Sequence, residues 1–432
     1  MPNKYLFISE TGDGCGLAMH LQRLGHSVMV HIRERKSALN YDGLLPKVTN
    51  WEKFLDKDTV VIFDSSGGGK TGDRLRAKGQ AVFMGSVFAD QLELDRDLAF
   101  EFMKQVGIKV PHSEEFTNWE AGRQFAKRHK GRLVFKPNGA LAKDDKTKSY
   151  VASDDGDMIE MLNYYERIAS KPPSFELQEF HKGIAVSTEG WFNGHEFMKP
   201  FNHTIERKAV MNDDLGGSGG CSGNIVWAWP YGSNHVIEDG IARMSPVLEE
   251  YGYVGPIDLN TIVAEDGVWA LEFTPRFGYD AMPTLLELYT GDFGELLASL
   301  ARGERPREMV LKSGFGSGLR ITVPPFPAEQ FRHEGGVPVR GFDKGWLEHC
   351  YFFEVMINEL GSLVTAPAYG SVVCITSQGS TIEDSFNFPY HVAKEVRIPN
   401  KQYRTDLISS LGMDHARLMR MLEIRRREGE HG

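Results

Sequence analysis

Residues 256–278 read PIDLNTIVAEDGVWALEFTPRFG, two β-type runs joined by the turn sequence AEDG. This pattern predicts a β-hairpin. Asp258 lies on its first strand and Glu272 on its second, so a shared site requires both carboxylates to point to one face. Carboxylates placed in this way suit Mg²⁺, which proteins hold through one or two carboxylates together with substrate phosphates. Arg276 follows closely, and its planar guanidinium matches a phosphoryl group in transfer.

A surface hairpin with ordinary charges is the alternative for this stretch. Glu272 argues against it, because it lies within the apolar run VWALEF, where an unpaired carboxylate is costly. We therefore predict a phosphoryl-transfer site at this hairpin, with Asp258 and Glu272 as metal ligands.

A lysine-bearing strand precedes the hairpin. The run RLVFKPNG (132–139) places Lys136 at the end of an apolar strand, and a polar stretch with Lys143, Lys146 and Lys148 follows. Ammonium groups so placed suit a polyphosphate, and a mobile loop can close over it and exclude water. A solvated hairpin with snorkelling lysines is the alternative.

A second strand, in SFELQEFHKG (174–183), ends with acidic side chains. Such groups can accept hydrogen bonds from an adenine amino group or a ribose, although glutamates at strand ends are also common on plain surfaces.

The first hundred residues alternate strand-like and helix-like runs, the strands being KYLFIS (4–9), VMVHI (28–32), TVVIF (59–63) and AVFMG (81–85). This alternation predicts a parallel sheet with right-handed crossovers. Ligands of such sheets bind beyond the carboxyl ends of the strands, where the glycine loops 12–16 and 67–72 fall. One long helix is predicted from Phe88 to Gly107. The last hundred residues contain short β-type runs, which predict a compact final domain of antiparallel character: GLRITV (318–323), YFFEVMI (351–357), SVVCITS (371–377) and EVRI (395–398).

The loop SSGGGKTG (65–72) resembles a P-loop but fails its pattern, because the leading glycine is replaced by Asp64. A glycine-rich loop that closes a strand can still hold an anion, and a plain βα turn is the alternative. The other loop, in TGDGCGLA (11–18), lacks the G-x-G-x-x-G spacing, which argues against a Rossmann dehydrogenase.

Composition limits the possible partners. The chain has 432 residues and a net charge of −10, which argues against non-specific nucleic-acid binding. Its four cysteines show no C-x-x-C spacing, and no apolar run approaches the roughly 20 residues of a membrane helix. We expect a cytoplasmic protein that binds neither nucleic acid nor membrane.

Taken in order, the lysine strand, lysine loop, acidic strand end, carboxylate hairpin and arginine resemble the ATP-grasp ligases. In detail the chain is similar to the phosphoribosylamine–glycine ligases of purine biosynthesis. Residues 83–116, FMGSVFADQLELDRDLAFEFMKQVGIKVPHSEEF, follow that family's LE.SK.FAK.FM pattern, and KQYRTDL (401–407) follows its YRTDIG. The runs LVFKPNG, LQEFHKG and LEFTPRFG are shared across the ATP-grasp group. The likeness covers roughly residues 1–412.

The resemblance implies an α/β protein in three parts. An N-terminal domain with a doubly wound parallel sheet would span 1–105 and bind substrate. An ATP-grasp fold in two subdomains would span 106–305, with a lid at about 118–182. A small C-terminal α+β domain would span 306–425.

The resemblance also implies a reaction. ATP would activate the carboxylate of glycine as an acyl phosphate, and the amine of 5-phosphoribosylamine would then attack it. The products would be glycinamide ribonucleotide, ADP and phosphate. The implied ligands are these small molecules and Mg²⁺ or Mn²⁺, and a monomer is expected.

Residue roles follow by matched position. For ATP, Lys136 would contact the phosphates, Lys148 would be the second lysine, and Glu179 would lie at the adenine. For the metal, Glu272 and Asp258 would be joined by Thr274, which replaces the Asn of the family's EFN. Arg276 and Lys208 would be the catalytic cations, Lys208 matching the lysine of the family's DHKR.

Two glycine-rich segments would bind the substrates. Gly219 and Gly220 lie in DLGGSGGCSG, at the place of the family's DLGPNTGGMG. Gly67, Gly68 and Lys70 occupy a place beside the phosphoribosyl site, so we predict that they bind the sugar phosphate and not ATP.

Several positions depart from the family. ETGDGCGLA replaces GSGGREHA, so Arg-Glu-His is absent, and GIA (183–185) replaces GEE, so the usual ribose-binding acid is missing. Glu189 lies on the strand face of Ala185 and is the predicted substitute. In RFGYDA, Asp280 is a stand-in for the acids of RFGDPE. Two alternatives therefore stay open: an ATP-grasp ligase that joins other small substrates, and a non-catalytic nucleotide-binding protein. The retained Lys136, Glu272 and Arg276 argue against the second.

Overall fold

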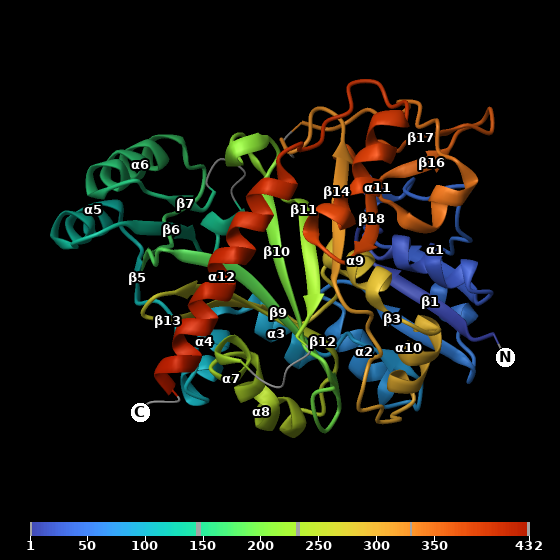
Figure 1. Cartoon of the computed structure of the whole chain (residues 1–432), viewed down its shortest axis with the longest axis horizontal. Helices are drawn as coiled ribbons and strands as arrows, with labels where there is room; N and C mark the ends of the chain where they lie inside the picture. The colour runs from blue at the N-terminus through green and yellow to red at the C-terminus, as the bar shows by residue number, and fades with distance from the viewer. Residues whose placement is uncertain (1, 144–147, 230–233, 329–330, 430–432) are drawn as a thin grey trace.

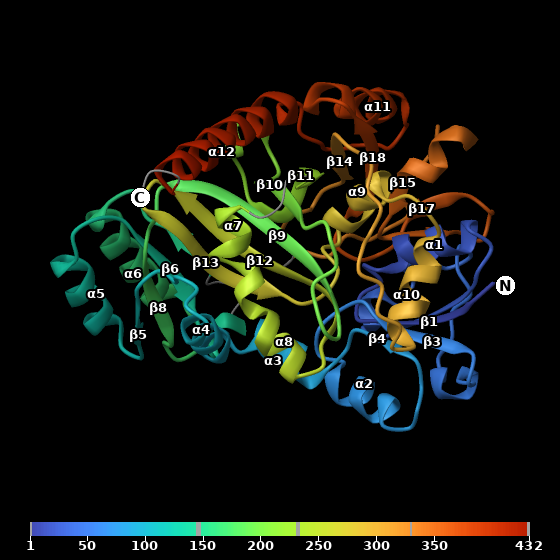
Figure 2. The ribbon, with the colours of Figure 1, turned by 60° about the horizontal axis from the view of Figure 1, so that its bottom comes forward.

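The protein is described from a computed structural model, which covers residues 2–143, 148–229, 234–328 and 331–429. A four-stranded parallel sheet lies at one end of the molecule and a smaller four-stranded sheet at the other (Figures 1 and 2). An eight-stranded antiparallel sheet lies between them. No helix in the described ranges is long and apolar enough to cross a membrane.

The N-terminal sheet has the strand order β2-β1-β3-β4, and its strands are β1 (Lys4–Ser9), β2 (Ser27–Ile32), β3 (Thr59–Phe63) and β4 (Val82–Phe83). Every pairing in this order is parallel, as the alternation of runs predicts. Helix α1 (Cys15–Arg23) follows β1, and α2 (Gly69–Arg76) follows β3. Their N-terminal loops lie beyond the carboxyl ends of these strands.

The predicted single helix from Phe88 to Gly107 is wrong. The chain forms α3 (Val87–Leu94) and α4 (Arg96–Gln105), which are separated by Asp95 in an extended conformation. The Asp95 side chain accepts a hydrogen bond from the backbone N–H of Leu98, so this residue caps the second helix.

The smaller sheet carries the order β5-β8-β6-β7 and antiparallel pairing. Helices α5 (Trp119–Arg128) and α6 (Asp155–Ile168) cover it (Figure 1). Its strands are β5 (Ser113–Phe116), β6 (Leu133–Pro137), β7 (Tyr150–Val151) and β8 (Phe175–Glu179). It has a core of its own, in which Phe135, Phe175 and Trp119 pack together.

The large sheet has the order β13-β12-β9-β10-β11-β14-β18-β15. Its strands are β9 (Gly183–Asn193), β10 (Asn202–Ala209), β11 (Ser218–Ala228), β12 (Val254–Ala264), β13 (Gly267–Thr274), β14 (Phe315–Thr322), β15 (Cys350–Phe352) and β18 (Ser371–Gly379). The glycine-rich segment DLGGSGGCSG (214–223) is a strand from Ser218 onward, so β11 takes in most of its glycines.

The predicted hairpin of β12 and β13 is confirmed, and it contains a bulge. Thr261 pairs with Ala270, but the next pair is Asn260 with Glu272, so Leu271 is an extra residue. Opposed residues of an antiparallel pair share a face. The bulge therefore places Glu272 and Thr274 on the same face as Asn260 and Asp258.

The C-terminal part of the chain extends the large sheet, because β14, β18 and β15 pair onto β11 in succession. Its other elements include the small hairpin of β16 (Val355–Ile357) and β17 (Leu363–Thr365), with α11 (Ile382–Glu395) and α12 (Leu407–Gly429). The predicted strand at EVRI is wrong, since Glu395 ends α11 and Arg397 makes only an isolated bridge to Arg340. The domain boundaries at 105 and 305 stay predictions.

Four further helices connect or flank these strands: α7 (His235–Glu238), α8 (Ser245–Glu250), α9 (Ala281–Leu288) and α10 (Phe293–Ala301). Helix α9 packs against β11, β14 and β18, and so links the end of the β12–β13 hairpin to the C-terminal strands.

Candidate active site

A cavity of about 310 Å³ lies over strands β9 to β13 of the large sheet. It brings together seven of the residues predicted from the sequence: Lys208, Gly219, Gly220, Asp258, Glu272, Thr274 and Arg276. These seven residues lie up to about 70 positions apart in the sequence. The topology of the sheet brings them together.

The floor of the cavity is a patch of oxygen-bearing side chains. Asp258 and Asn260 of β12 face Thr274 and Glu272 of β13, and Ser187 of β9 lies beside them. Ser187 donates a hydrogen bond to Oδ2 of Asp258 and another to Oδ1 of Asn260 over 3.2 Å. The Asn260 amide donates in turn to Thr274 Oγ1 over 3.3 Å.

This patch fits a magnesium ion. The second carboxylate oxygen of Asp258, Oδ1, is buried and accepts no hydrogen bond from the described residues. Burial raises the pKa of Asp258 to about 7, with Glu206 and Glu272 adding to the rise. A cation would remove that cost, and carboxylate and amide oxygens are the ligands that Mg²⁺ prefers.

Asn260 was missed from the sequence, although it supplies the amide oxygen that Thr274 lacks. The alternating pair Asp258 and Asn260 on one strand is the signal that could have found it, because side chains two apart share a face. The argument from the burial of Glu272 is wrong: its side chain is exposed to the cavity although its neighbour Phe273 is buried. The site, not the core, accounts for a carboxylate in this apolar run.

Two cations line the cavity as predicted. Lys208 on β10 lies 3.4 Å from Glu206 of the same strand. Burial opposes its charge, but Glu206 and Glu272 hold the pKa of Lys208 above its usual value. Arg276 donates from Nε to Glu93 on α3 over 2.9 Å and lies over the ring of Tyr279.

A third cation, Arg320 on β14, was not predicted. Its Nε donates to Oδ1 of Asp280 over 2.8 Å, and Nη2 donates to the other oxygen, so the pair is bidentate. Both side chains are largely buried yet line the cavity. Asp280 thus has a structural partner of its own, and the C-terminal strands contribute to the site. The arginine in GLRITV, a charge within a β-type run, was the available signal.

Lys136 comes from the smaller sheet, and it lies close enough to the hairpin for the charge of Glu272 to affect its pKa. Its pKa is lowered to about 8, chiefly by burial and then by Arg96, whereas Glu272 and Glu176 oppose the fall. Lys136 is paired with Glu176 of β8, so both side chains share the face of that sheet. The face of the smaller sheet that carries Lys136 therefore lies within electrostatic reach of Glu272 on the hairpin.

The acidic residue chosen on β8, Glu179, lies on the opposite face from Lys136, in line with the core residues Phe175 and Leu177. The side chains that share the Lys136 face are Glu176 and Gln178. Both are buried, and each has an atom without a hydrogen-bond partner among the described residues, Glu176 Oε2 and Gln178 Nε2. Period-two alternation along SFELQEF was the signal that separates these positions from Glu179.

None of the four predicted ATP-binding residues, Lys136, Lys148, Glu179 and Glu189, lines the cavity itself. Lys148 is exposed, its backbone bonded to the hydroxyl of Tyr165, and Lys146 lies outside the described residues. Glu189 is buried opposite Asp258, on the same face of the sheet, and accepts a hydrogen bond from Trp191 Nε1 over 2.8 Å. Burial raises the pKa of Glu189 to about 8. Because Glu189 does not line the cavity, a direct bond from its side chain to a ribose is not supported.

The loop of Gly67, Gly68 and Lys70 also lies outside this cavity. Its backbone N–H groups at Gly67 and Gly69 donate to the carboxylate of Asp90, over 2.8 and 2.7 Å. A side chain at Gly69 would collide with the backbone of Ser86 at 2.4 Å, so glycine is needed there for packing. The backbone N–H groups of this loop therefore bind the carboxylate of Asp90, an anion that belongs to the protein itself. This arrangement gives no support to a sugar phosphate bound at the loop.

Several known proteins are similar to the chain in sequence. The phosphoribosylamine–glycine ligase of Streptococcus pneumoniae strain R6 is 23% identical over 343 residues, which are 78% of this chain and 80% of that protein. A bifunctional purine biosynthetic protein of Pichia angusta is 24% identical over 350 residues, covering 76% of this chain and 42% of that protein. No protein-family model matches the chain.

Solved structures share the fold. The crystal structure of phosphoribosylamine–glycine ligase from Thermotoga maritima has a TM-score of 0.71 at 20% identity, covering 93% of this chain and 99% of that one. The biotin carboxylase domain of Hydrogenobacter thermophilus 2-oxoglutarate carboxylase, in complex with MgADP and bicarbonate, has a TM-score of 0.61 at 12% identity, covering 93% and 92%. The chain is therefore a distant homologue of the phosphoribosylamine–glycine ligases and has the fold of the ATP-grasp enzymes.

Proposed function

We propose that the protein joins glycine to 5-phosphoribosylamine with consumption of ATP, giving glycinamide ribonucleotide, ADP and phosphate. The observation that carries the proposal is the cavity in which the β12–β13 hairpin aligns Asp258, Asn260 and Glu272 opposite Lys208 and Arg276. The similarity to ligases of this name over 78% of the chain supports the choice of substrates.

The chemistry follows from the charges. A carboxylate is a poor electrophile until one oxygen becomes part of a phosphate leaving group. Transfer of a phosphoryl group needs positioning and neutralisation of negative charge more than covalent help. Arg276 and Lys208 supply positive charge at the cavity wall, and Lys136 supplies it from the smaller sheet. Mg²⁺, held by Asp258, Glu272 and Asn260, would neutralise the phosphate oxygens of bound ATP.

Water must be kept from the acyl phosphate until the amine attacks. The smaller sheet, with Lys136, Glu176 and Gln178 on one face, is suited to cover ATP. We expect Gln178 and Glu176, with their unpartnered atoms, to replace Glu179 as the polar contacts of the nucleoside.

A second candidate is the ligation of other small substrates by the same chemistry. The occupation of the glycine loop by Asp90 favours it, because that loop was the predicted phosphate site. The two candidates share ATP, Mg²⁺ and the acyl phosphate, and they differ only in carboxylate and amine. In either case we expect a cytoplasmic monomer that acts on small molecules.

The test is a reaction of the purified protein with ATP, Mg²⁺, glycine and freshly generated phosphoribosylamine, followed by mass spectrometry of ADP and product. Each substrate is omitted in turn. Glu272→Gln removes a proposed metal ligand, and Glu265→Gln, in the exposed turn of the same hairpin, is the matched control. Light scattering of the same preparation gives the oligomeric state.

Product that needs both glycine and the amine, survives in Glu265→Gln and is lost in Glu272→Gln is the expected result. ATP binding without product moves the assignment to the second candidate, and a screen of amino acids and amines follows. A protein that does not bind ATP contradicts both.

A further inference from the structure

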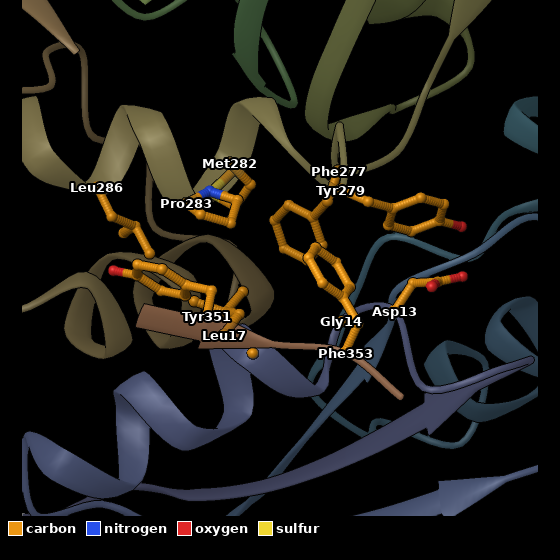
Figure 3. A pocket seen from close by; sticks show the side chains of 11 residues that line it. Asp13, Gly14, Leu17, Phe277, Tyr279, Met282, Pro283, Leu286, Tyr351 and Phe353 are labelled. Carbon is orange, nitrogen blue, oxygen red and sulfur yellow. The ribbon is translucent and has the colours of Figure 1, made fainter. Parts of the chain in front are cut away.

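Asp13 is an acidic residue that lines the large cavity and that the proposed reaction has not yet used. It lies in the loop between β1 and α1 and lines the large cavity together with Arg276, Tyr279 and Arg320. Figure 3 shows its carboxylate beside the hydroxyl end of Tyr279, both directed away from the apolar side chains of an adjoining small cavity. The N-terminal part of the chain thus contributes a carboxylate to the lining of the large cavity.

The adjoining cavity cannot hold the substrate. Its walls are apolar and aromatic, formed by Leu17, Phe277, Met282 and Tyr351 among others, and its volume is about 10 Å³. That is room for about one water molecule. Whatever Asp13 binds must therefore come from the large cavity, where the phosphoryl-transfer groups lie.

Within the described residues, the carboxylate of Asp13 is not neutralised by a partner of opposite charge. Thr11 donates a hydrogen bond to it, but no ion pair involving Asp13 forms within the described part of the chain. Arg276 and Arg320 attract it from across the cavity, yet each already has a carboxylate partner, Glu93 and Asp280. Burial raises the pKa of Asp13, and Glu34 adds to the rise, so the group holds a proton more readily than an exposed aspartate.

The loop of Asp13, ETGDGCGLA (10–18), contains no lysine or arginine and presents a carboxylate to the cavity. A carboxylate at this place suits a cationic group, and ligation brings two such groups to the cavity, the ammonium group of glycine and the protonated amine of the second substrate.

We propose that Asp13 binds the attacking amine and accepts its proton. This inference rests on the proposed ligase function. The amine nitrogen forms a bond to the acyl carbon, the carbon–oxygen bond to phosphate breaks, and phosphate leaves with the bonding electrons. Asp13 accepts one proton from the ammonium group and so leaves a neutral amine, and the second proton, released as the amide forms, passes to the departing phosphate. Arg276 stays charged and neutralises the departing phosphate.

Two assays separate the two half-reactions. Ligation is measured with glycine and phosphoribosylamine. Acyl phosphate formation is measured by trapping with hydroxylamine, which gives a hydroxamate and needs no base at neutral pH because this amine is already uncharged. The variants are Asp13→Asn, which keeps the shape, and Asp13→Glu, which keeps the charge. Glu10→Gln is the control, because Glu10 lies in the same loop, is exposed and pairs with Arg33 away from the cavity.

We expect Asp13→Asn to lower kcat for ligation by about 100-fold or more, the usual contribution of a general base. Hydroxamate formation should stay close to that of wild type, Asp13→Glu should recover part of the ligation, and Glu10→Gln should change neither assay. If Asp13→Asn does not fold, Asp13→Ser takes its place.

Equal losses in both assays, or no loss in either, would overturn the assignment of Asp13. A folded wild-type protein that forms no hydroxamate from glycine would overturn the proposed function, and this inference with it. The hydroxylamine assay therefore distinguishes failure of the base from failure of the whole reaction.

Discussion

Arg276 donates a hydrogen bond from Nε to Oε1 of Glu93 over 2.9 Å, although 183 residues separate them in sequence. The other oxygen of Glu93 accepts from the hydroxyl of Ser66, in the glycine loop after β3. A chain of two hydrogen bonds thus joins that loop to the cation expected to face the reacting phosphates. The N-terminal part of the protein fixes the orientation of a side chain that belongs to the large sheet.

Loss of the hydrogen bond between Arg276 and Glu93 should slow the reaction without weakening ATP binding. In Glu93→Gln the charge that holds Arg276 is removed, and we expect kcat to fall about 10-fold while the KM for ATP changes little. Steady-state kinetics with Glu101→Gln, on the exposed side of the neighbouring helix α4, as the control would check this. An increase in KM with unchanged kcat would contradict a role in orientation.

The buried carboxylate of Glu189 should make the stability of the metal-free protein depend on pH. Its pKa is raised to about 8 in the folded state, so the folded chain holds a proton that the unfolded chain releases near pH 4.5. The stability that this group confers is full below the unfolded pKa and is lost as pH rises through the folded pKa, at about 1 kcal/mol per pH unit between them. Glu189→Gln should therefore flatten the fall of unfolding free energy from pH 5 to 8, which urea titrations at several pH values would show. Equal slopes in both proteins would contradict this.

Lys136 should contribute to ATP use from the smaller sheet. Lys136→Met keeps the length and removes the charge, and we expect kcat/KM for ATP to fall about 100-fold, because a positive charge in a water-poor site is lost. Lys104→Met, at an exposed position of α4, is the matched control. Initial rates over a range of ATP concentrations give the comparison, and similar losses in both variants would argue for a general charge effect.

Lys70 should be dispensable. The sequence favoured it as a phosphate contact, but it is exposed and the loop amides beside it are bonded to Asp90. Lys70→Ala should leave the KM for phosphoribosylamine within about 2-fold, whereas Asp90→Ala should lower the unfolding free energy by about 1–3 kcal/mol, since two N–H groups lose their acceptor. A large rise in the KM for the amine in Lys70→Ala would restore the original assignment.

The sequence was sufficient for elements with a strong local signal. The parallel strands and the β12–β13 hairpin follow from hydrophobic periodicity and turn residues. Arg276, Lys208 and the two hairpin carboxylates were found because a short motif carries them. Arg320 and Asp13 were missed because they reach the cavity from segments far away in sequence, through strand pairing that periodicity does not report. The sequence-based prediction of a phosphate site at the loop of Gly67 and Gly68 did not include Asp90, because Asp90 lies on another helix.

Leu271, the extra residue of β13, has a consequence for comparing this chain with its relatives. Counted from the turn in a regular ladder, Leu271 would stand opposite Asn260, and Glu272 would point to the other face. A chain without this residue could form the regular ladder and still set its glutamate opposite the asparagine. A one-residue gap at this position of an alignment would then record a difference in backbone shape, and the same set of metal ligands would lie on either side of it.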